Sequence, residues 1–187
     1  DWGAGSVFRK QEKQLFENFH QNAVHKDLDE TQPLVLHRGW IRPSWTDYNG
    51  HMTESRYLQV FGDATDALLG YLGLDQEYLD SGFSVFTVES HIRHLDEGAP
   101  GSNFVVKTQL LGGDEKRLHI WHELLDQESG SLFATGEHML LHVDTRAAKS
   151  CTMQSRLLSK SQQLRSLHQS LKRPEAAGRS IALPSGN

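Results

Sequence analysis

The stretch from Trp45 to Tyr57, which reads WTDYNGHMTESRY, places one carboxylate in a turn directly before an amphipathic helix. Asn49-Gly50 is a turn dipeptide, and Asp47 lies two residues before it. The first backbone N–H groups of a helix have no partner inside the helix, and the helix dipole favours negative charge there. The pattern therefore predicts a general base or nucleophile, Asp47, beside backbone donors that can bind a developing oxyanion.

The elements around this turn are indicated by the periods of their apolar residues. Residues 34–40 form a strand-like run, and from Tyr57 apolar side chains recur at helical spacing, with Phe61, Leu68 and Leu72 on the face we expect to be buried. After a short helical turn at 76–79, strand-like runs follow at 86–92, 104–110, 118–125 and 132–143. Turn residues separate the last three, which predicts an antiparallel meander. We expect an α+β protein whose antiparallel sheet wraps around one long helix.

The residues of the turn also carry a resemblance. The run resembles the signature D-x-x-G-H-[VM]-x-x-x-x-Y of the 4-hydroxybenzoyl-CoA thioesterase branch of the hotdog superfamily, which Asp47, Gly50, His51, Met52 and Tyr57 match. The longer string, through SVFTVESHIRHLDEGAPG, is most similar to betainyl-CoA thioesterases, including those fused to a carnitine dehydrogenase. The resemblance spans roughly residues 34–143 and implies a hotdog fold and thioester hydrolysis.

The resemblance implies roles for the residues of the turn. Asp47 is expected to be the catalytic group, acting on water or attacking the thioester directly, although an Asp here also commonly caps a turn or helix. Asn49 is a candidate for orienting Asp47 or the water, or it serves only the geometry of the turn. His51 is a candidate for a hydrogen bond near the thioester, or it has a structural role. Glu54 is a second candidate acid or base. Alternatively, it stands in the first turn of the helix only because a negative charge there interacts favourably with the helix dipole. The backbone N–H groups of residues 53–55 are the expected oxyanion donors.

Substrate-binding candidates come from the same turn and from the strand at 86–92. Trp45 and Tyr48 offer aromatic faces that attract a quaternary ammonium by about 0.5–2 kcal/mol per contact, whereas Trp40 and Trp121 are expected in the core. Gly50 permits close backbone approach. Tyr57, from the motif, is a further candidate. So are Thr87, Glu89 and His91. These three alternate with the apolar residues Phe86, Val88 and Ile92, so we expect them to share one face of the strand.

Composition excludes several classes of function. The 187-residue chain suits one compact domain with additional tails, and its net charge of −5 with dispersed basic residues gives no footprint for nucleic acid. No apolar run approaches the roughly 20 residues that span a bilayer, and a single cysteine, Cys151, fits a reducing compartment. We expect a cytoplasmic protein without membrane partners. The histidine pairs His91/His94 and His119/His122 lie three apart on strands, on opposite faces, so we expect no metal and no cofactor beyond coenzyme A in the substrate.

The predicted domain organisation has four parts. Residues 1–33 are expected to form an accessory helix or linker, 34–150 the hotdog thioesterase domain, and 151–173 an amphipathic helix that packs on its own sheet or on a neighbouring subunit. Residues 174–187 have too little apolar content to order themselves. Because a half-barrel of this kind leaves an edge strand exposed, a homodimer or higher homo-oligomer is expected.

Two functions from different classes remain open on the sequence. The first is an acyl-CoA thioesterase acting on betainyl-CoA or a similar small cationic acyl-CoA. The second is a non-catalytic module that binds acyl-CoA or oligomerises a carnitine dehydrogenase-type system. A dehydratase of the same fold is a weaker third option, because it would usually place its histidine and carboxylate differently.

Overall fold

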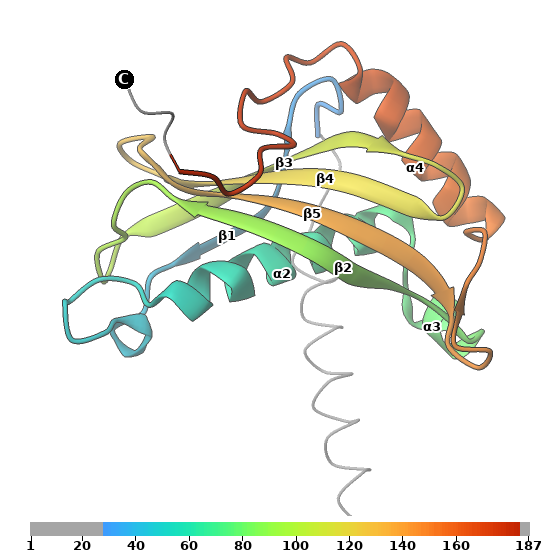
Figure 1. Cartoon of the computed structure of the whole chain (residues 1–187), viewed down its shortest axis with the longest axis horizontal. Helices are drawn as coiled ribbons and strands as arrows, with labels where there is room; N and C mark the ends of the chain where they lie inside the picture. Colours follow the sequence, from blue (N-terminus) through green and yellow to red (C-terminus); the bar gives the residue numbers. More distant parts are fainter. Residues whose placement is uncertain (1–27, 184–187) are drawn as a thin grey trace, which may run out of the picture.

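A curved antiparallel sheet packed against one long helix forms the centre of the described protein (Figure 1). The computed structural model describes residues 28–183, so the accessory helix expected within 1–33 lies largely outside the described residues. In chain order the elements are β1 (Leu34–Trp40), the 3₁₀ turn η1 (Pro43–Trp45), α2 (Glu54–Leu72), α3 (Gln76–Asp80), β2 (Phe83–His94), β3 (Asn103–Gly113), β4 (Arg117–Asp126), β5 (Leu132–Asp144), β6 (Lys149–Ser150) and α4 (Ser155–His168).

The sheet has the strand order β1-β3-β4-β5-β2, and each neighbouring pair is antiparallel. Helix α2 lies along one face, which we call the inner face, and the chain after α4 runs over the opposite, outer face (Figure 1). The hotdog architecture and the α+β class predicted from the sequence are confirmed. The expected strands at 86–92 and 104–110 are longer in the structure, because the sheet pairs residues beyond the alternating runs.

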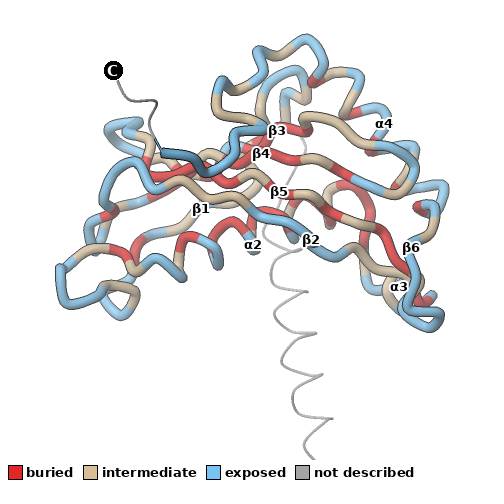
Figure 2. Tube along the Cα trace, viewed as in Figure 1, coloured by how far each residue is buried: buried red, intermediate tan, exposed pale blue. Residues whose placement is uncertain are grey.

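The core lies between α2 and the inner face of the sheet. One side of α2 is buried at a spacing of three and four residues, as an amphipathic helix requires, by Tyr57, Val60, Phe61, Ala64, Thr65, Leu68, Leu69 and Leu72. Figure 2 shows burial concentrated on this side of α2 and in the central strands. The packing holds the first turn of α2, and therefore the residues before it, at one end of the sheet.

Polar groups on the inner face are buried and paired. The ring of His122, fully buried, lies 3.0 Å from Thr65 Oγ1 and 2.9 Å from Thr108 Oγ1, and it stacks on Phe61. His138 Nδ1 lies 2.7 Å from Ser90 Oγ. Burial lowers the pKa of His138 to about 4, and burial lowers the pKa of His122 well below its ordinary value. Both rings are therefore neutral at neutral pH.

Helix α4 packs beside the second half of α2. Leu157 and Leu164 are buried in the core cluster that also contains Leu72, and Arg156 Nη1 lies 2.8 Å from Asp75 Oδ2. The amphipathic helix expected at 151–173 is thus present over a shorter range and packs on its own chain. Trp40, expected in the core, is instead 49% exposed, because it ends β1 at the rim of the sheet.

The outer face is covered by the segment that follows α4. The Gly178 N–H lies 2.9 Å from both Oε1 and Oε2 of Glu137, and Gln109 Nε2 lies 3.4 Å from the carbonyl oxygen of Lys172. His119 Nε2 lies 2.6 Å from Glu137 Oε1. Sequence analysis expected no order from residue 174 onward, whereas these contacts anchor the segment as far as Gly178. Hydrogen bonds to the sheet hold this polar segment in place. The prediction considered only the number of apolar residues, which says nothing about such hydrogen bonds.

Strand β2 is an edge of the sheet. Two of its apolar side chains face solvent in this chain, Phe86 at 52% and Val88 at 55% exposure. A register shift between Thr87 and Glu89 bulges the strand against β5. Exposed apolar residues on an unpaired strand edge are uncommon in a monomer, because such an edge can pair with another chain.

Candidate active site

The turn that carries Asp47 is held closed by its own backbone. The Asp47 N–H donates to the carbonyl oxygen of His51 at 3.0 Å, and the Gly50 N–H donates to that of Asp47 at 3.0 Å. Asp47 Oδ1 accepts from the Asn49 N–H at 2.8 Å, so the carboxylate also closes a local Asx turn. Gly50 has a φ of 81°, which explains the glycine at this position. The Asp47 carboxylate is exposed, and within residues 28–183 its Oδ2 accepts no hydrogen bond.

The start of α2 leaves two backbone donors beside this turn. The Thr53 N–H, one of the three expected oxyanion donors, instead donates to the carbonyl oxygen of Trp45 at 2.8 Å and is not available. Within residues 28–183, the N–H groups of Glu54 and Ser55 have no acceptor. The oxyanion site predicted for residues 53–55 therefore narrows to these two donors. The Glu54 side chain is exposed in the first turn of α2, where its charge suits the helix dipole.

The loop between β2 and β3 completes the surroundings of the turn. His51 Nδ1 lies 3.1 Å from Glu97 Oε2, so His51 pairs with this carboxylate rather than with Asp47. The Met52 N–H donates to the carbonyl oxygen of Gly98 at 3.0 Å, which ties the loop to the turn that carries Asp47. Sequence reasoning did not select Glu97. The turn-forming run DEGAPG marks a loop there, but nothing in its spacing shows that it meets a residue 46 positions earlier.

Tyr57 positions this loop from below. Its ring is 4% exposed and lies edge-on to His94 with ring centroids 4.8 Å apart, and its hydroxyl accepts from the Gly98 N–H at 3.3 Å. Burial raises the pKa of Tyr57. A Cβ on Gly98 would lie 2.5 Å from Ile41 Cδ1, the end of a buried side chain that would have to move, so a glycine lets the loop approach without displacing Ile41. The structure thus gives Tyr57, expected at the substrate, a buried contact with the loop.

The aromatic candidates of the turn differ in their surroundings. Tyr48 is 96% exposed. The ring of Trp45 has the guanidinium of Arg42 at 5.3 Å and that of Arg56 at 5.8 Å from its centroid. Because both guanidinium groups are cationic, this ring already has the contacts that were expected to attract a cationic acyl group.

Asp63, in the third turn of α2, is a titratable group that the sequence did not single out. Burial, and secondarily the charge of Asp66, raise the pKa of Asp63 to about 6, with the charge of Arg42 acting in the opposite direction. The one sequence feature that could have identified Asp63 is its place in the helix, where a carboxylate lies next to the row of buried apolar residues.

The candidates on β2 are divided by the bulge. Thr87 pairs with Leu140, a core residue, whereas Glu89 pairs with Met139 and His91 with Glu137. Directly opposed residues of antiparallel strands share a face, so Thr87 belongs to the inner face and Glu89 and His91 to the outer face. The expectation that all three share one face is corrected: simple alternation fails at the extra residue. Within one chain, Glu89 and His91 are not brought together with Asp47.

Residues 28–183 contain no group of three or more His, Cys, Asp or Glu side chains arranged to hold a metal ion. No helix among these residues is long and apolar enough to cross a membrane.

The comparisons with known proteins agree with the fold. The model of the thioesterase-like superfamily matches residues 41–161, and the chain belongs to this superfamily. It is similar to the betainyl-CoA thioesterase of Pseudomonas aeruginosa, with 43% identity over 155 residues that cover 82% of this chain and 98% of that protein. It is also similar to the L-carnitine dehydrogenase/betainyl-CoA thioesterase of Agrobacterium fabrum, with 49% identity over 158 residues, 84% of this chain and 31% of that protein.

Two solved structures share the arrangement. A putative thioesterase from Pseudomonas putida superposes with a TM-score of 0.70 at 35% identity, covering 82% of this chain and 98% of that one. A hypothetical protein from Staphylococcus aureus, solved in complex with CoA, gives a TM-score of 0.75 at 26% identity, covering 79% and 94%. The chain spans about a third of the length of the two-activity relatives that it matches.

Proposed function

We propose that this chain is an acyl-CoA thioesterase that hydrolyses betainyl-CoA, or a similar small cationic acyl-CoA, to the free acid and coenzyme A. One observation carries the proposal: an exposed carboxylate, Asp47, is fixed in a turn beside the two unpaired N–H groups that open α2. Membership of the thioesterase-like superfamily and 43% identity to a betainyl-CoA thioesterase over nearly its whole length support the reaction and the acyl group.

The chemistry follows from these groups. The thioester carbonyl oxygen accepts hydrogen bonds from the Glu54 and Ser55 N–H groups, which stabilise the negative charge that develops on it. Asp47 then removes a proton from an attacking water, or attacks the carbonyl carbon itself to give a mixed anhydride that water cleaves. In both routes the C–S bond breaks, and the coenzyme A thiolate leaves and takes up a proton. His51, paired with Glu97, helps to position the turn.

Selectivity for a cationic acyl group is proposed to rest on Tyr48 and on the acidic groups near the turn. The ring of Trp45 already has two guanidinium groups within 6 Å of its centroid, so a quaternary ammonium there would meet like charges. Tyr48 is fully open to a ligand, and the carboxylates of Glu54 and Glu97 lie at the start of α2 and beside His51. These groups offer the aromatic face and the negative charge that such a cation favours.

We propose that the protein acts as a homodimer or higher homo-oligomer in the cytoplasm. The Asp47 turn is open to solvent in one chain, and the β2 edge exposes Phe86 and Val88. A second copy paired along β2 would cover these side chains and supply a further wall for the acyl group. Thr87, on the inner face of the same strand, would then lie at the junction between the copies.

The direct test is to mix the protein with a panel of acyl-CoA thioesters, including betainyl-CoA, acetyl-CoA and a neutral isostere of betainyl-CoA, and to follow the released thiol with a thiol reagent. We expect release from betainyl-CoA at a kcat/KM at least tenfold above the neutral isostere. Thioesters that bind but stay intact would instead support a non-catalytic acyl-CoA-binding module and would refute the proposal.

A further inference from the structure

The outer face of the sheet contains a cavity that the proposed chemistry does not use. It has a volume of about 530 Å³ and lies between the sheet and residues 171–176 of the segment after α4. This volume falls within the roughly 300–1,000 Å³ typical of small-molecule sites. The segment forms one wall of the cavity. It is held near the start of this wall by the hydrogen bond from Gln109 to Lys172, and just beyond its end by the hydrogen bonds from Gly178 to Glu137.

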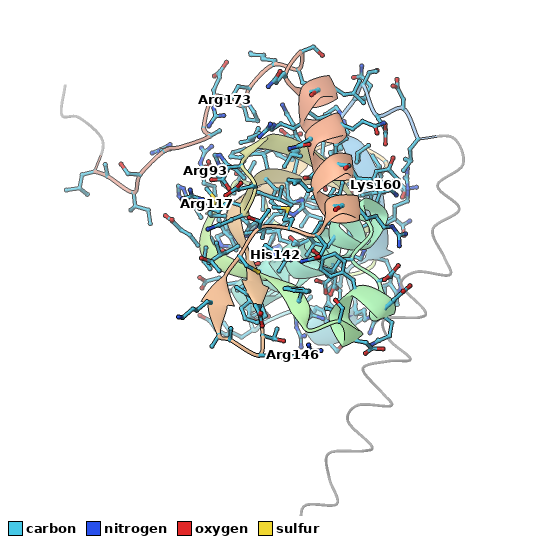
Figure 3. The ribbon with its side chains drawn as sticks, turned by 90° about the vertical axis from the view of Figure 1, so that its right-hand side faces the viewer. Arg93, Arg117, His142, Arg146, Lys160 and Arg173 are labelled. Carbon is cyan, nitrogen blue, oxygen red and sulfur yellow. The ribbon has the colours of Figure 1, made fainter. Side chains whose placement is uncertain are left out.

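The lining of the cavity combines an apolar floor with cationic groups. Trp121, on β4, is 4% exposed beneath it, and Leu132 lies nearby on β5. Arg93 enters from β2, and Lys172 and Arg173 from the covering segment. Figure 3 shows Arg93 and Arg173 on the side of the molecule where this segment runs.

The cavity is lined by three cationic side chains and two carboxylates. Its carboxylates are Glu123 and Glu175, and Glu175 already pairs with Lys172 at 3.2 Å. Glu123 Oε1 accepts from the Trp121 indole N–H at 3.4 Å. Among residues 28–183, the guanidinium groups of Arg93 and Arg173 have no ion pair or hydrogen-bond partner. Two guanidinium groups without partners above an apolar floor are suited to an anion attached to an aromatic ring system.

The cavity also lies close to the catalytic turn along the chain. Leu95 lines the cavity, and three residues further Gly98 contacts Met52 in the turn. Three extended residues span at most about 11 Å. A thioester held at Asp47 would have to run its flexible pantetheine arm past Gly98, around the β2–β3 loop, to bring its other end to the outer face.

We propose that this cavity binds the phosphorylated nucleoside end of the coenzyme A substrate, with Arg93 and Arg173 on its phosphates and the adenine over the apolar floor. The proposal rests on the proposed function for the source of the ligand. It assigns the two faces different tasks, with acyl chemistry at the end of the inner face and nucleotide binding on the outer face.

Binding can be measured separately from turnover. Isothermal titration of the full chain with adenosine 3′,5′-bisphosphate and with coenzyme A should show binding of both in competition with each other. Arg93→Ala and Arg173→Ala should each weaken binding of the bisphosphate about tenfold. Arg179→Ala, a matched loss of one cation further along the same segment, should leave it unchanged. Failure of the bisphosphate to bind, binding that does not compete with coenzyme A, or equal binding by all three variants would overturn the proposal.

Kinetics separate this inference from the function on which it rests. In Arg93→Ala, KM for betainyl-CoA should rise about tenfold with kcat unchanged, while KM for betainyl-pantetheine, which lacks the nucleotide, should not change. Hydrolysis with identical KM in wild type and variant would refute the nucleotide site and leave the thioesterase intact. Competitive bisphosphate binding that the variants weaken, without any hydrolysis, would support the site and refute the proposed function. Thermal melts of each variant check that it is folded.

Discussion

The two faces of the sheet differ in how they use polar residues. On the inner face, polar side chains are buried under α2, and His122 and His138 stay neutral with hydroxyl partners. On the outer face, polar side chains such as His119 and Glu137 pair with each other and with the segment after α4. The difference indicates that the inner face provides a packed support for the Asp47 turn, the proposed site of catalysis, whereas the outer face is covered by a segment that hydrogen bonds hold.

The largest expected difference in stability between the two faces appears when the pH is lowered. The unfolded chain protonates its histidines below a pH of about 6.5, whereas His138 in the folded protein has a pKa of about 4. The unfolding free energy is therefore highest above pH 6.5 and falls as the pH drops toward 4, by about 2 kcal/mol at pH 5 for His138 alone. Urea unfolding at pH 7.5 and pH 5 measures this loss. His138→Gln should reduce the difference between the two pH values, and an unchanged difference would show that the inner face is not acid-sensitive at this residue.

A smaller effect is expected where the loop meets the end of the inner face. Gly98→Ala places a Cβ 2.5 Å from Ile41 Cδ1, the end of a fully buried side chain, so the Ile41 side chain or the loop must shift, at a cost of about 1 kcal/mol. Because Gly98 contacts Met52, kcat should fall as well. Gly62→Ala is the matched control, since its Cβ meets nothing within 4 Å and an alanine favours the helix. Equal stability and kcat in the two variants would remove the link between loop and turn.

The smallest effect is expected on the outer face. Glu137→Gln removes the charge that holds His119 and Gly178, and should lower the unfolding free energy by about 1 kcal/mol. Trypsin should also cleave the covering segment faster, after Lys172 and Arg179, while kcat stays unchanged. Glu175→Gln, in an exposed ion pair, should alter stability very little. A fall in kcat for Glu137→Gln would contradict the division between the faces.

Much of the inner face could be predicted from the sequence. The helical period from Tyr57 to Leu72 and the alternation of the later strands fix which side chains meet in the core. The turn chemistry of Asn49-Gly50 follows from local preferences, and the structure confirms a left-handed Gly50. These features depend on residues close together in the chain, so periodicity and turn preferences were sufficient.

The remainder depended on contacts between distant residues. Pairing of His51 with Glu97, the loss of the Thr53 N–H to Trp45 and the two arginines beside Trp45 all arise from how the turn folds back on its neighbours. The bulge that separates Thr87 from Glu89 breaks the alternation on which their common face was predicted. The ordered segment after α4 depends on Glu137, more than 40 residues before Gly178. Local patterns carry no information about such partners.

The central claim is that Asp47 performs the chemistry at the end of the inner face. Asp47→Asn tests it most directly, because the amide oxygen can still accept from the Asn49 N–H and preserve the turn while the base or nucleophile is lost. Measured with betainyl-CoA at saturation, kcat should fall by about a thousandfold or more, with an unchanged thermal melt and unchanged binding of adenosine 3′,5′-bisphosphate. A kcat within about tenfold of the wild-type value, in a variant that melts normally, would contradict the account.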